Sequence, residues 1–257
     1  MKQKYKLISK SIFFEKEKIL AIADLHIGHE EAMNKAGVLL PRIQFKETME
    51  DLKKIFFEIS KLQNFEDHQE SKKQRIPEIG KVNEIIICGD LKHEFSTISE
   101  QEWRETYKLI EYLKKYCNKI ILVRGNHDKI LGRMSEKIEI VDYYLLGDIV
   151  FLHGNRLFPE ILDKNIKMLV MGHRHPAVTI SDKYKKEKFK CFLVGKWKRK
   201  EIIILPSFFP LIEGSDLIEE GGNLLFIKEK DLRNFCVFVV GDRVYDFGKM
   251  RNIGVLG

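Results

Sequence analysis

The chain has 257 residues, and its 44% of hydrophobic and 11% of aromatic residues suffice for a sizeable core, which excludes a disordered protein. The formal charge of +7 at pH 7 permits an acidic partner such as nucleic acid or a phosphorylated substrate, but does not by itself indicate one. The four cysteines form no C-x-x-C pair, no signal peptide is recognisable and no apolar run approaches the ~18 residues of a membrane span, so we expect a reducing, cytoplasmic setting without membrane contact.

Strand-like and helical patterns alternate over the first two thirds of the sequence. Runs rich in Ile, Leu and Val are near-continuously apolar and predict strands covered on both faces, at 18–23, 84–88, 119–123, 148–152 and 166–171. Apolar residues at helical spacing predict helices over 45–62 and 99–117, and Ser99 and Glu102 have the spacing of a capping box. The aromatic residues on both helices are interpreted as core.

The remainder of the chain is charged at one connection and β-rich at the end. Residues 64–81 have almost no apolar pattern, and we interpret them as an exposed connection. From residue 177 onward the stretches AVTIS, KCFLVGKW, EIIIL, NLLFI and NFCVFVVGDRVYDFG predict strands, the last being a hairpin that turns near Gly241. We expect one domain over 1–257 with a β-rich half over 177–257, and a two-sheet core with outer helices.

Seven of the eight histidines follow the five predicted strands. The polar residues at these strand ends are Asp24, His26 and His29, then Asp90 and His93, then Asn126, His127 and Asp128, then His153, and finally His173 and His175. Ligand sites of open α/β sheets lie beyond the carboxyl ends of the strands. One such histidine alone is more often an ordinary core or surface residue, but the same placement at five strand ends predicts a shared metal site.

The chemistry of these side chains narrows the choice of metal ion. Imidazole nitrogens with carboxylate and amide oxygens, and no thiolate, suit Mn²⁺, Fe or Zn²⁺ better than Ca²⁺. The candidate ligands are Asp24, His26, Asp90, Asn126, His153, His173 and His175. Seven ligands exceed the needs of one four-coordinate ion and fit two ions that share a bridging carboxylate. Paired ions ~3.5–4 Å apart clamp the attacking and leaving oxygens of a phosphoryl transfer and lower the pKa of bound water towards about 7.

The motifs D-x-H, G-D-x-x-(D/H), G-N-H-(D/E), H and G-H-x-H occur in this order between residues 24 and 175. In this combination they resemble the calcineurin-like metallophosphoesterase superfamily. The resemblance implies an α/β (α+β) fold, a four-layer αββα sandwich of two mixed β-sheets flanked by helices. The stretches ADLHIGHE, LVRGNHD and ILPSFFPL are most similar to the archaeal SbcD-related phosphoesterases and the ligase-associated phosphoesterase PdeM of bacteria.

The resemblance also implies how the ligands divide between two divalent ions. One ion would be held by Asp24, His26, Asp90 and His175, and the other by Asp90, Asn126, His153 and His173, so that Asp90 is the bridge. Mn²⁺ is the expected metal, with Fe, Zn or Ni as alternatives.

Three further residues are expected to act on the substrate. By the resemblance, His127 faces the scissile phosphate as an acid or charge stabiliser, and Asp128 orients His127 through a ring nitrogen. Gly125 would allow the tight turn before them, and the alternative for Asp128 is a plain turn residue. His93 has the position seen in nucleases of this superfamily and would contact substrate phosphate, the alternative being a supporting or exposed histidine.

Residues 183–200 form a basic segment with nine Lys or Arg, interleaved with Tyr184, Phe189 and Trp197. This pattern suits contact with a nucleic-acid backbone and its bases, but we prefer to interpret it as a solvated, Lys-rich hairpin.

The leading prediction is a two-metal phosphodiesterase or nuclease that acts on DNA, RNA or a nucleotide diester. A phosphomonoesterase acting on nucleotides or phosphoproteins is the second candidate, because the same metals serve both reactions. A non-catalytic metal-binding scaffold is the third. The oligomeric state is left open.

Overall fold

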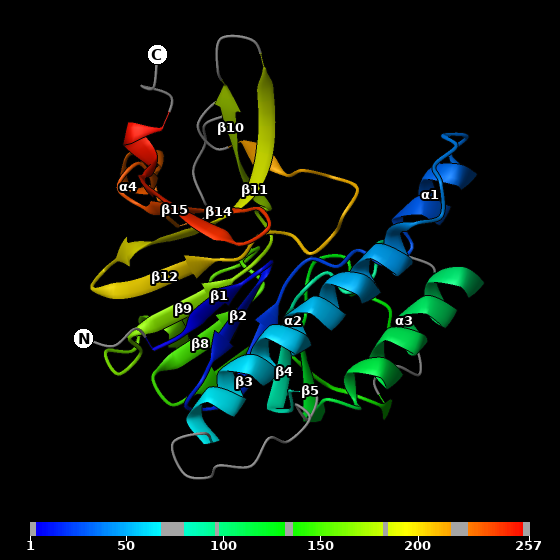
Figure 1. The fold of residues 1–257 in the computed structure, drawn as a ribbon, viewed down its shortest axis with the longest axis horizontal. Helices are drawn as coiled ribbons and strands as arrows, with labels where there is room; N and C mark the ends of the chain where they lie inside the picture. The colour runs from blue at the N-terminus through cyan, green and yellow to red at the C-terminus, as the bar shows by residue number, and fades with distance from the viewer. Residues whose placement is uncertain are drawn as a thin grey trace.

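The computed structural model describes residues 4–67, 80–95, 98–131, 136–181, 185–216 and 226–253. Two β-sheets pack face to face, and the helices α2 (Gln44–Asp67) and α3 (Glu100–Leu113) cover the outer face of the first sheet (Figure 1). The short helix α1 (His29–Lys35) lies between β3 and α2 in the chain.

The first sheet has the strand order β1-β2-β3-β4-β5-β6. Its strands are β1 (Lys6–Ile8), β2 (Ser11–Phe14), β3 (Ile19–Ile22), β4 (Val82–Cys88), β5 (Cys117–Val123) and β6 (Glu139–Val141). Strands β1 to β3 pair antiparallel, whereas β3 to β6 pair parallel. The ends of β3, β4 and β5 therefore lie along one edge, which we call the carboxyl edge, and the starts of β4, β5 and β6 lie along the opposite amino edge.

The second sheet has the order β13-β10-β11-β12-β9-β8-β7, and β14 pairs with both β11 and β15. Its strands are β7 (Tyr143–Leu146), β8 (Ile149–Leu152), β9 (Met168–Met171), β10 (Pro176–Ser181), β11 (Lys186–Trp197), β12 (Lys200–Ile204), β13 (Ser215–Asp216), β14 (Cys236–Val240) and β15 (Val244–Lys249). Strands β8, β9 and β12 run parallel, so their carboxyl ends also lie together.

The alternation of side chains along the strands produces three apolar layers. Along β4, Ile85 and Ile87 pack against the helices, whereas Ile86 and Cys88 pack against the second sheet. The outer face of the second sheet is covered by three short helices, η2 (Pro159–Leu162), α4 (Glu229–Leu232) and η3 (Met250–Asn252), through residues such as Leu232. The predicted four-layer αββα sandwich of two mixed sheets is confirmed.

The five strands predicted from apolar runs are all present, but they belong to two sheets. Strands β3, β4 and β5 lie in the first sheet, and β8 and β9 lie in the second. The C-terminal hairpin is also confirmed, because Val240 pairs with Val244 across the turn. The hairpin of β1 with β2, and the short strands β6, β7 and β13, were not predicted; such short strands leave little apolar pattern.

The helix predictions need two corrections. The second helix ends at Leu113 and not at residue 117, because Cys117 already begins β5. Tyr107 is 38% exposed and lies beside Lys137, so it is not a core residue. The capping box is confirmed, since the Ser99 side chain accepts from the Glu102 backbone and the Glu102 side chain from that of Ser99.

Some predictions fall partly outside the described residues. These are most of the connection at 64–81, including His68, then Tyr184, and most of the stretch NLLFI. Within the described residues, none of the helices combines the length and apolarity that crossing a bilayer requires. All four cysteines are free thiols.

Candidate metal centre

Backbone hydrogen bonds continue beyond the strand ends and bring the polar loops together. At the carboxyl edge, the backbone N–H of Asp24 donates to Gly89 over 3.1 Å, and that of His26 donates to Asp90 over 2.9 Å. The second sheet joins through His173, whose backbone N–H donates to the Asp24 carboxylate at 2.8 and 3.1 Å. All seven candidate ligands therefore come from one region, where both sheets end.

Asp24, His26 and His175 form a first cluster. One nitrogen or oxygen of each lies within 4.8 Å of the others. Nε2 of His26 is 3.3 Å from Nε2 of His175, which in turn is 3.5 Å from Oδ1 of Asp24.

Asp90, His153 and His173 form a second cluster, again with ligand atoms within 4.8 Å of one another. Nε2 of His153 lies at its centre. It is 3.1 Å from Nδ1 of His173 and 3.4 Å from Oδ2 of Asp90. The amide oxygen of Asn126 is 2.9 Å from the same nitrogen.

Asp90 belongs to the second cluster and also faces the first. Its Oδ2 atom is 3.7 Å from Nε2 of His26 in the first cluster and 3.4 Å from Nε2 of His153 in the second. Its Oδ1 atom accepts the backbone N–H of His127 at 2.9 Å. One buried carboxylate thus faces both sets of ligands.

The donor set fits a pair of divalent ions. Asp24, Asp90 and His153 are at most 2% exposed. Among the described residues, neither carboxylate is paired with a lysine or an arginine; their charged neighbours are histidines. Buried carboxylates need a cation or a dense set of hydrogen bonds, and carboxylate, imidazole and amide donors without thiolate suit divalent transition metals.

The electrostatics favour the ligand forms that bind metal. Burial works to raise the pKa of Asp24 and of Asp90, but His175 and His153 respectively outweigh it, and both pKa values lie below the ordinary range. Burial lowers the pKa of His26 to about 3 and that of His173 to about 4. At neutral pH these carboxylates are therefore ionised and these imidazoles neutral, as metal binding requires.

His153 differs from these histidines. Burial works to lower its pKa, but the carboxylates of Asp90 and Asp24 outweigh burial and raise the pKa to about 9. In the metal-free protein, this imidazolium supplies a positive charge between the two carboxylates. A divalent ion would take its place and release the proton.

The backbone is strained at most of the candidate ligands. Nine described residues other than glycine have a positive φ, and five of them are candidate ligands: Asp24 (55°), His26 (46°), Asp90 (50°), His173 (69°) and His175 (43°). Such left-handed conformations cost about 1–3 kcal/mol each and persist where the surrounding structure enforces them. The strain turns successive side chains towards one point.

Two motif glycines leave room for the ligand carboxylates. A Cβ atom on Gly125 would collide with Oδ1 of Asp90, and one on Gly172 would lie 2.6 Å from Oδ2 of Asp24. The expected tight turn is present, because the backbone N–H of Asp128 donates to the carbonyl of Gly125 at 3.3 Å, but Gly125 does not have a positive φ. Glycine is needed at position 125 because a larger side chain has no room beside the Asp90 carboxylate.

Asp128 does not orient His127 as expected. Its Oδ2 atom accepts the backbone N–H of Gly125 at 3.0 Å, and Oδ1 accepts those of Leu91 and Lys92 at 3.1 and 3.4 Å. Nδ1 of His127 instead lies against the backbone carbonyl of His93. Asp128 is a buried residue that joins the loops after β4 and β5, and burial raises its pKa to about 6.

His93 lies in the site, beside the metal clusters. Its ring centroid is 5.3 Å from that of His127 and 5.5 Å from that of His26. His29 is not among the candidate ligands, but its ring centroid lies 4.6 Å from that of His93. Burial, with the nearby charges of His29 and His127, lowers the pKa of His93 to about 4.

A segment after β12 supports the site and was missed as a functional element. The Ser207 hydroxyl donates to the backbone carbonyl of Asp24 at 3.0 Å, and the backbone N–H of Phe209 donates to the same oxygen at 3.1 Å. The Phe209 ring centroid is 4.6 Å from that of His29. The stretch ILPSFFPL contains this segment, but it had entered only as part of the resemblance.

Two lysines donate hydrogen bonds to backbone carbonyls of this segment. The Lys190 ammonium donates to the backbone carbonyls of Ser207, at 3.0 Å, and of Phe209. Lys10 donates to the carbonyl of Phe208 at 3.2 Å and pairs with Asp51 at 2.6 Å. Burial, with the nearby charge of Lys10, lowers the pKa of Lys190 to about 7.

The basic segment 183–200 contains the whole of the long strand β11. Phe189 and Trp197 are partly buried against the outer core of the second sheet, and Trp197 has its ring centroid 4.5 Å from that of Phe226. Lys190 points inward, as described above. In the described part of this segment, the aromatic rings therefore do not form an exposed surface for stacking.

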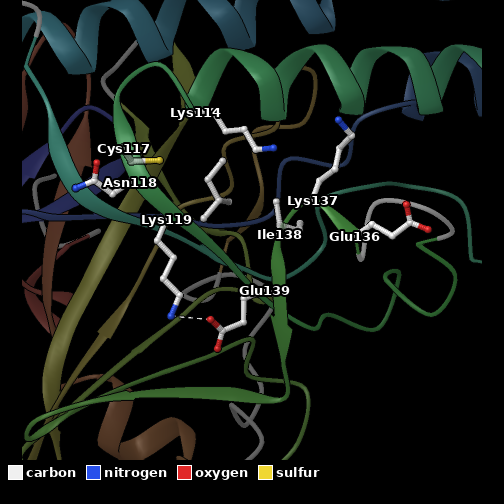
Figure 2. Close-up of a pocket in the computed structure, with 9 residues that line it drawn as sticks. Lys114, Cys117, Asn118, Lys119, Glu136, Lys137, Ile138 and Glu139 are labelled. Atoms are coloured by element: carbon white, nitrogen blue, oxygen red, sulfur yellow. Dashed lines mark ion pairs between the residues drawn. The ribbon is translucent and has the colours of Figure 1, made fainter.

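A pocket of 280 Å³ lies far from these clusters, at the starts of β5 and β6 (Figure 2). Lys119 pairs there with Glu139 at 2.6 Å, as the dashed line shows. Lys137 pairs with Glu111 at 3.2 Å. The lysines of the pocket are thus paired with exposed carboxylates, and we assign no chemistry to it.

Comparison with known proteins agrees with this geometry. Residues 17–232 match the family described as calcineurin-like phosphoesterase. No curated protein matches the chain. Among solved structures, nuclease MPE from Pseudomonas putida is similar with a TM-score of 0.55 and 18% identity, over 93% of this chain and 92% of that chain.

Two other solved structures are similar at lower TM-scores. AQ665 from Aquifex aeolicus, described as a protein of unknown function, has a TM-score of 0.33 and 20% identity over 61% of this chain and 78% of that chain. Vacuolar protein sorting 29 from Cryptosporidium parvum has a TM-score of 0.34 and 15% identity over 90% and 97%. The likeness to the Pseudomonas nuclease shows the shared fold, and the family match covers most of the sequence. The chain belongs to the calcineurin-like phosphoesterase family and is a metal-dependent phosphoester hydrolase.

Proposed function

We propose that the chain is a two-metal phosphodiesterase that cleaves nucleic-acid or nucleotide phosphodiesters. The observation that carries this proposal is the position of Asp90, whose Oδ2 atom faces His26 at 3.7 Å and His153 at 3.4 Å. One ion would be held by Asp24, His26, Asp90 and His175, and the other by Asp90, Asn126, His153 and His173. We propose Mn²⁺ as the metal, because imidazole and oxygen donors predominate.

When bound, the two ions lower the pKa of a water molecule and neutralise charge on the transferring phosphoryl group. His127 is placed to handle the leaving oxygen. Its backbone N–H is fixed on Asp90 at 2.9 Å, and its Nδ1 atom lies against the carbonyl of His93. A carbonyl only accepts, so Nδ1 carries a proton and Nε2 is the nitrogen left for the leaving oxygen. As general acid the ring would act in its imidazolium form, giving the Nε2 proton to the leaving oxygen and keeping the proton on Nδ1. We propose that His93 contacts a phosphate oxygen beside it.

Two observations support a diester over a monoester. The structurally similar MPE is a nuclease, and the stretches ADLHIGHE, LVRGNHD and ILPSFFPL resemble the SbcD-related and PdeM phosphoesterases. The third stretch includes Ser207 and Phe209, which contact the backbone of Asp24.

The test compares bis(p-nitrophenyl) phosphate with p-nitrophenyl phosphate. Protein stripped of metal and reloaded with Mn²⁺ is used, and Asp90→Asn serves as the blank. A clear diester preference, lost on stripping and restored by Mn²⁺, is the expected result. A monoester preference would overturn the proposal in favour of a phosphomonoesterase. Activity on neither substrate, together with an absence of bound metal by elemental analysis, would indicate a scaffold.

A further inference from the structure

An exposed aromatic ring lies on the histidine that we place at the leaving oxygen. Phe95 is 47% exposed, and its ring centroid is 3.7 Å from that of His127, with 32° between the ring planes. One face of the phenyl ring therefore covers the imidazole, and the ring still reaches solvent. The reaction as described above does not use Phe95.

The position of Phe95 is set by the backbone that precedes it. The buried carboxylate of Glu102 accepts the N–H groups of His93 and Glu94 at 2.8 and 3.0 Å. The Lys92 ammonium donates to the carbonyl of Glu94. These hydrogen bonds fix the backbone up to Glu94, and the Phe95 ring belongs to none of the three apolar layers.

Single exposed apolar side chains are common on protein surfaces, and Phe57 is another example. Phe95 differs because its ring lies 3.7 Å from the imidazole of His127, next to the clusters of candidate metal ligands. An aromatic face next to a phosphate site is the arrangement by which proteins bind unpaired nucleotides: the backbone is held by charge and the base stacks on the ring. A base inside a duplex already stacks on its neighbours and offers no free face.

We infer that Phe95 is the stacking platform for an unpaired nucleobase adjacent to the scissile phosphate. This inference rests on the proposed phosphodiesterase function and deepens it. The substrate class is a single-stranded or frayed nucleic acid, or a nucleotidyl diester, in preference to a diester without a base. Stacking of this kind tolerates any base, because every base has a π-face.

The first experiment uses two diesters with the same p-nitrophenolate leaving group, thymidine 5′-(p-nitrophenyl phosphate) and methyl p-nitrophenyl phosphate. Phe95→Ala and Phe95→Leu should raise KM for the thymidine diester by about 5- to 100-fold, with little effect on the methyl diester. Phe95→Tyr and Phe95→Trp should restore the low KM. Phe57→Ala is the matched control, since Phe57 is 56% exposed on α2, and it should change neither substrate.

An equal loss on both diesters would overturn the inference, because Phe95 would then only support His127. Unchanged KM values would overturn it as well. A second measurement is independent of turnover. Fluorescence anisotropy in EDTA measures the binding of a short oligothymidylate and of an abasic strand of equal charge. Phe95→Ala should abolish the preference for the strand with bases. If the wild type shows that preference but cleaves no diester, the proposed function fails and the stacking inference stands; the absence of any preference would overturn the inference.

Discussion

The two edges of the first sheet both carry many charged residues, yet only one is built for chemistry. At the amino edge, Lys119 and Glu139 neutralise each other at 2.6 Å and are both more than 40% exposed (Figure 2). At the carboxyl edge, the carboxylates of Asp24 and Asp90 are almost fully buried and face histidines. The amino edge has the pocket, but its charges are already satisfied in pairs. At the carboxyl edge the buried carboxylates have histidines as their charged neighbours, a donor set that divalent cations can use, and that distinguishes a functional site from a charged cavity.

The largest expected effect is at the bridge between the clusters. Asp90→Asn removes the charge that faces both His26 and His153, so both metals should bind weakly. Turnover should fall by more than the roughly 100-fold that loss of an outer-shell partner costs. Elemental analysis after gel filtration, together with kcat, measures both effects.

Asp148→Asn is the matched control, since Asp148 is an exposed carboxylate paired with Lys4 at 3.4 Å. It should leave metal content and kcat unchanged. Normal occupancy of both metal sites in Asp90→Asn would refute the bridge.

The next effect in size concerns His127. His127→Ala should keep the metals, because the ring is not among the proposed ligands, but should slow turnover by roughly 10²–10⁴-fold, the scale for loss of a general acid. The loss should be greatest for poor leaving groups, which need the proton most. Rates for a series of aryl methyl phosphates of rising phenol pKa provide the measurement. Full activity of the variant at the poorest leaving group would show that the assigned role is wrong.

A moderate effect on stability is expected for Lys190, which donates to the backbone carbonyls of Ser207 and Phe209. Above pH about 10.5, where the amine is neutral in folded and unfolded chains alike, Lys190→Met should be less stable by ~1–3 kcal/mol, because two backbone carbonyls lose their donor. The folded-state pKa of about 7 lies below the ordinary 10.5. As the pH falls, the unfolded chain therefore binds this proton first.

It follows that the stability of the wild type relative to Lys190→Met should fall as the pH falls from about 10.5 to about 7, far enough to reverse the order of the two proteins, and stay constant below that. Urea unfolding of both proteins across this range gives the difference. Lys10, Asp51 and Glu213 are the other charged groups that influence this pKa together with Asp24, and they are unchanged in the variant. A difference in stability that does not vary with pH would contradict the depressed pKa.

The smallest effect is expected at the amino edge. Lys119→Ala removes an exposed ion pair with Glu139 and should cost at most about 1 kcal/mol of stability, less at high salt. Turnover of bis(p-nitrophenyl) phosphate should be unchanged. A marked loss of turnover would mean that the amino edge takes part in the reaction, and the contrast between the two edges would fail.

Much of the carboxyl edge was predictable from the sequence, because five apolar runs each end in polar residues and the ends of parallel strands lie together. The division of β3 to β5 and of β8 and β9 between two sheets was not, since an apolar strand has the same pattern in either sheet. The partner of the His127 ring is the backbone carbonyl of His93, which no residue pattern reveals. Ser207 and Lys190 reach the site only through tertiary packing, far along the chain from Asp24.

The left-handed backbone at five candidate ligands sets a conflict between stability and activity. Glycine and asparagine adopt positive φ at lower cost than aspartate or histidine, so replacing these ligands relieves strain in the metal-free fold. A selection for heat resistance carried out in a chelator should therefore enrich glycine or asparagine at positions such as His26 and His175 and discard the metal centre. The same selection with Mn²⁺ present should retain them, because metal binding then contributes to the stability that is selected.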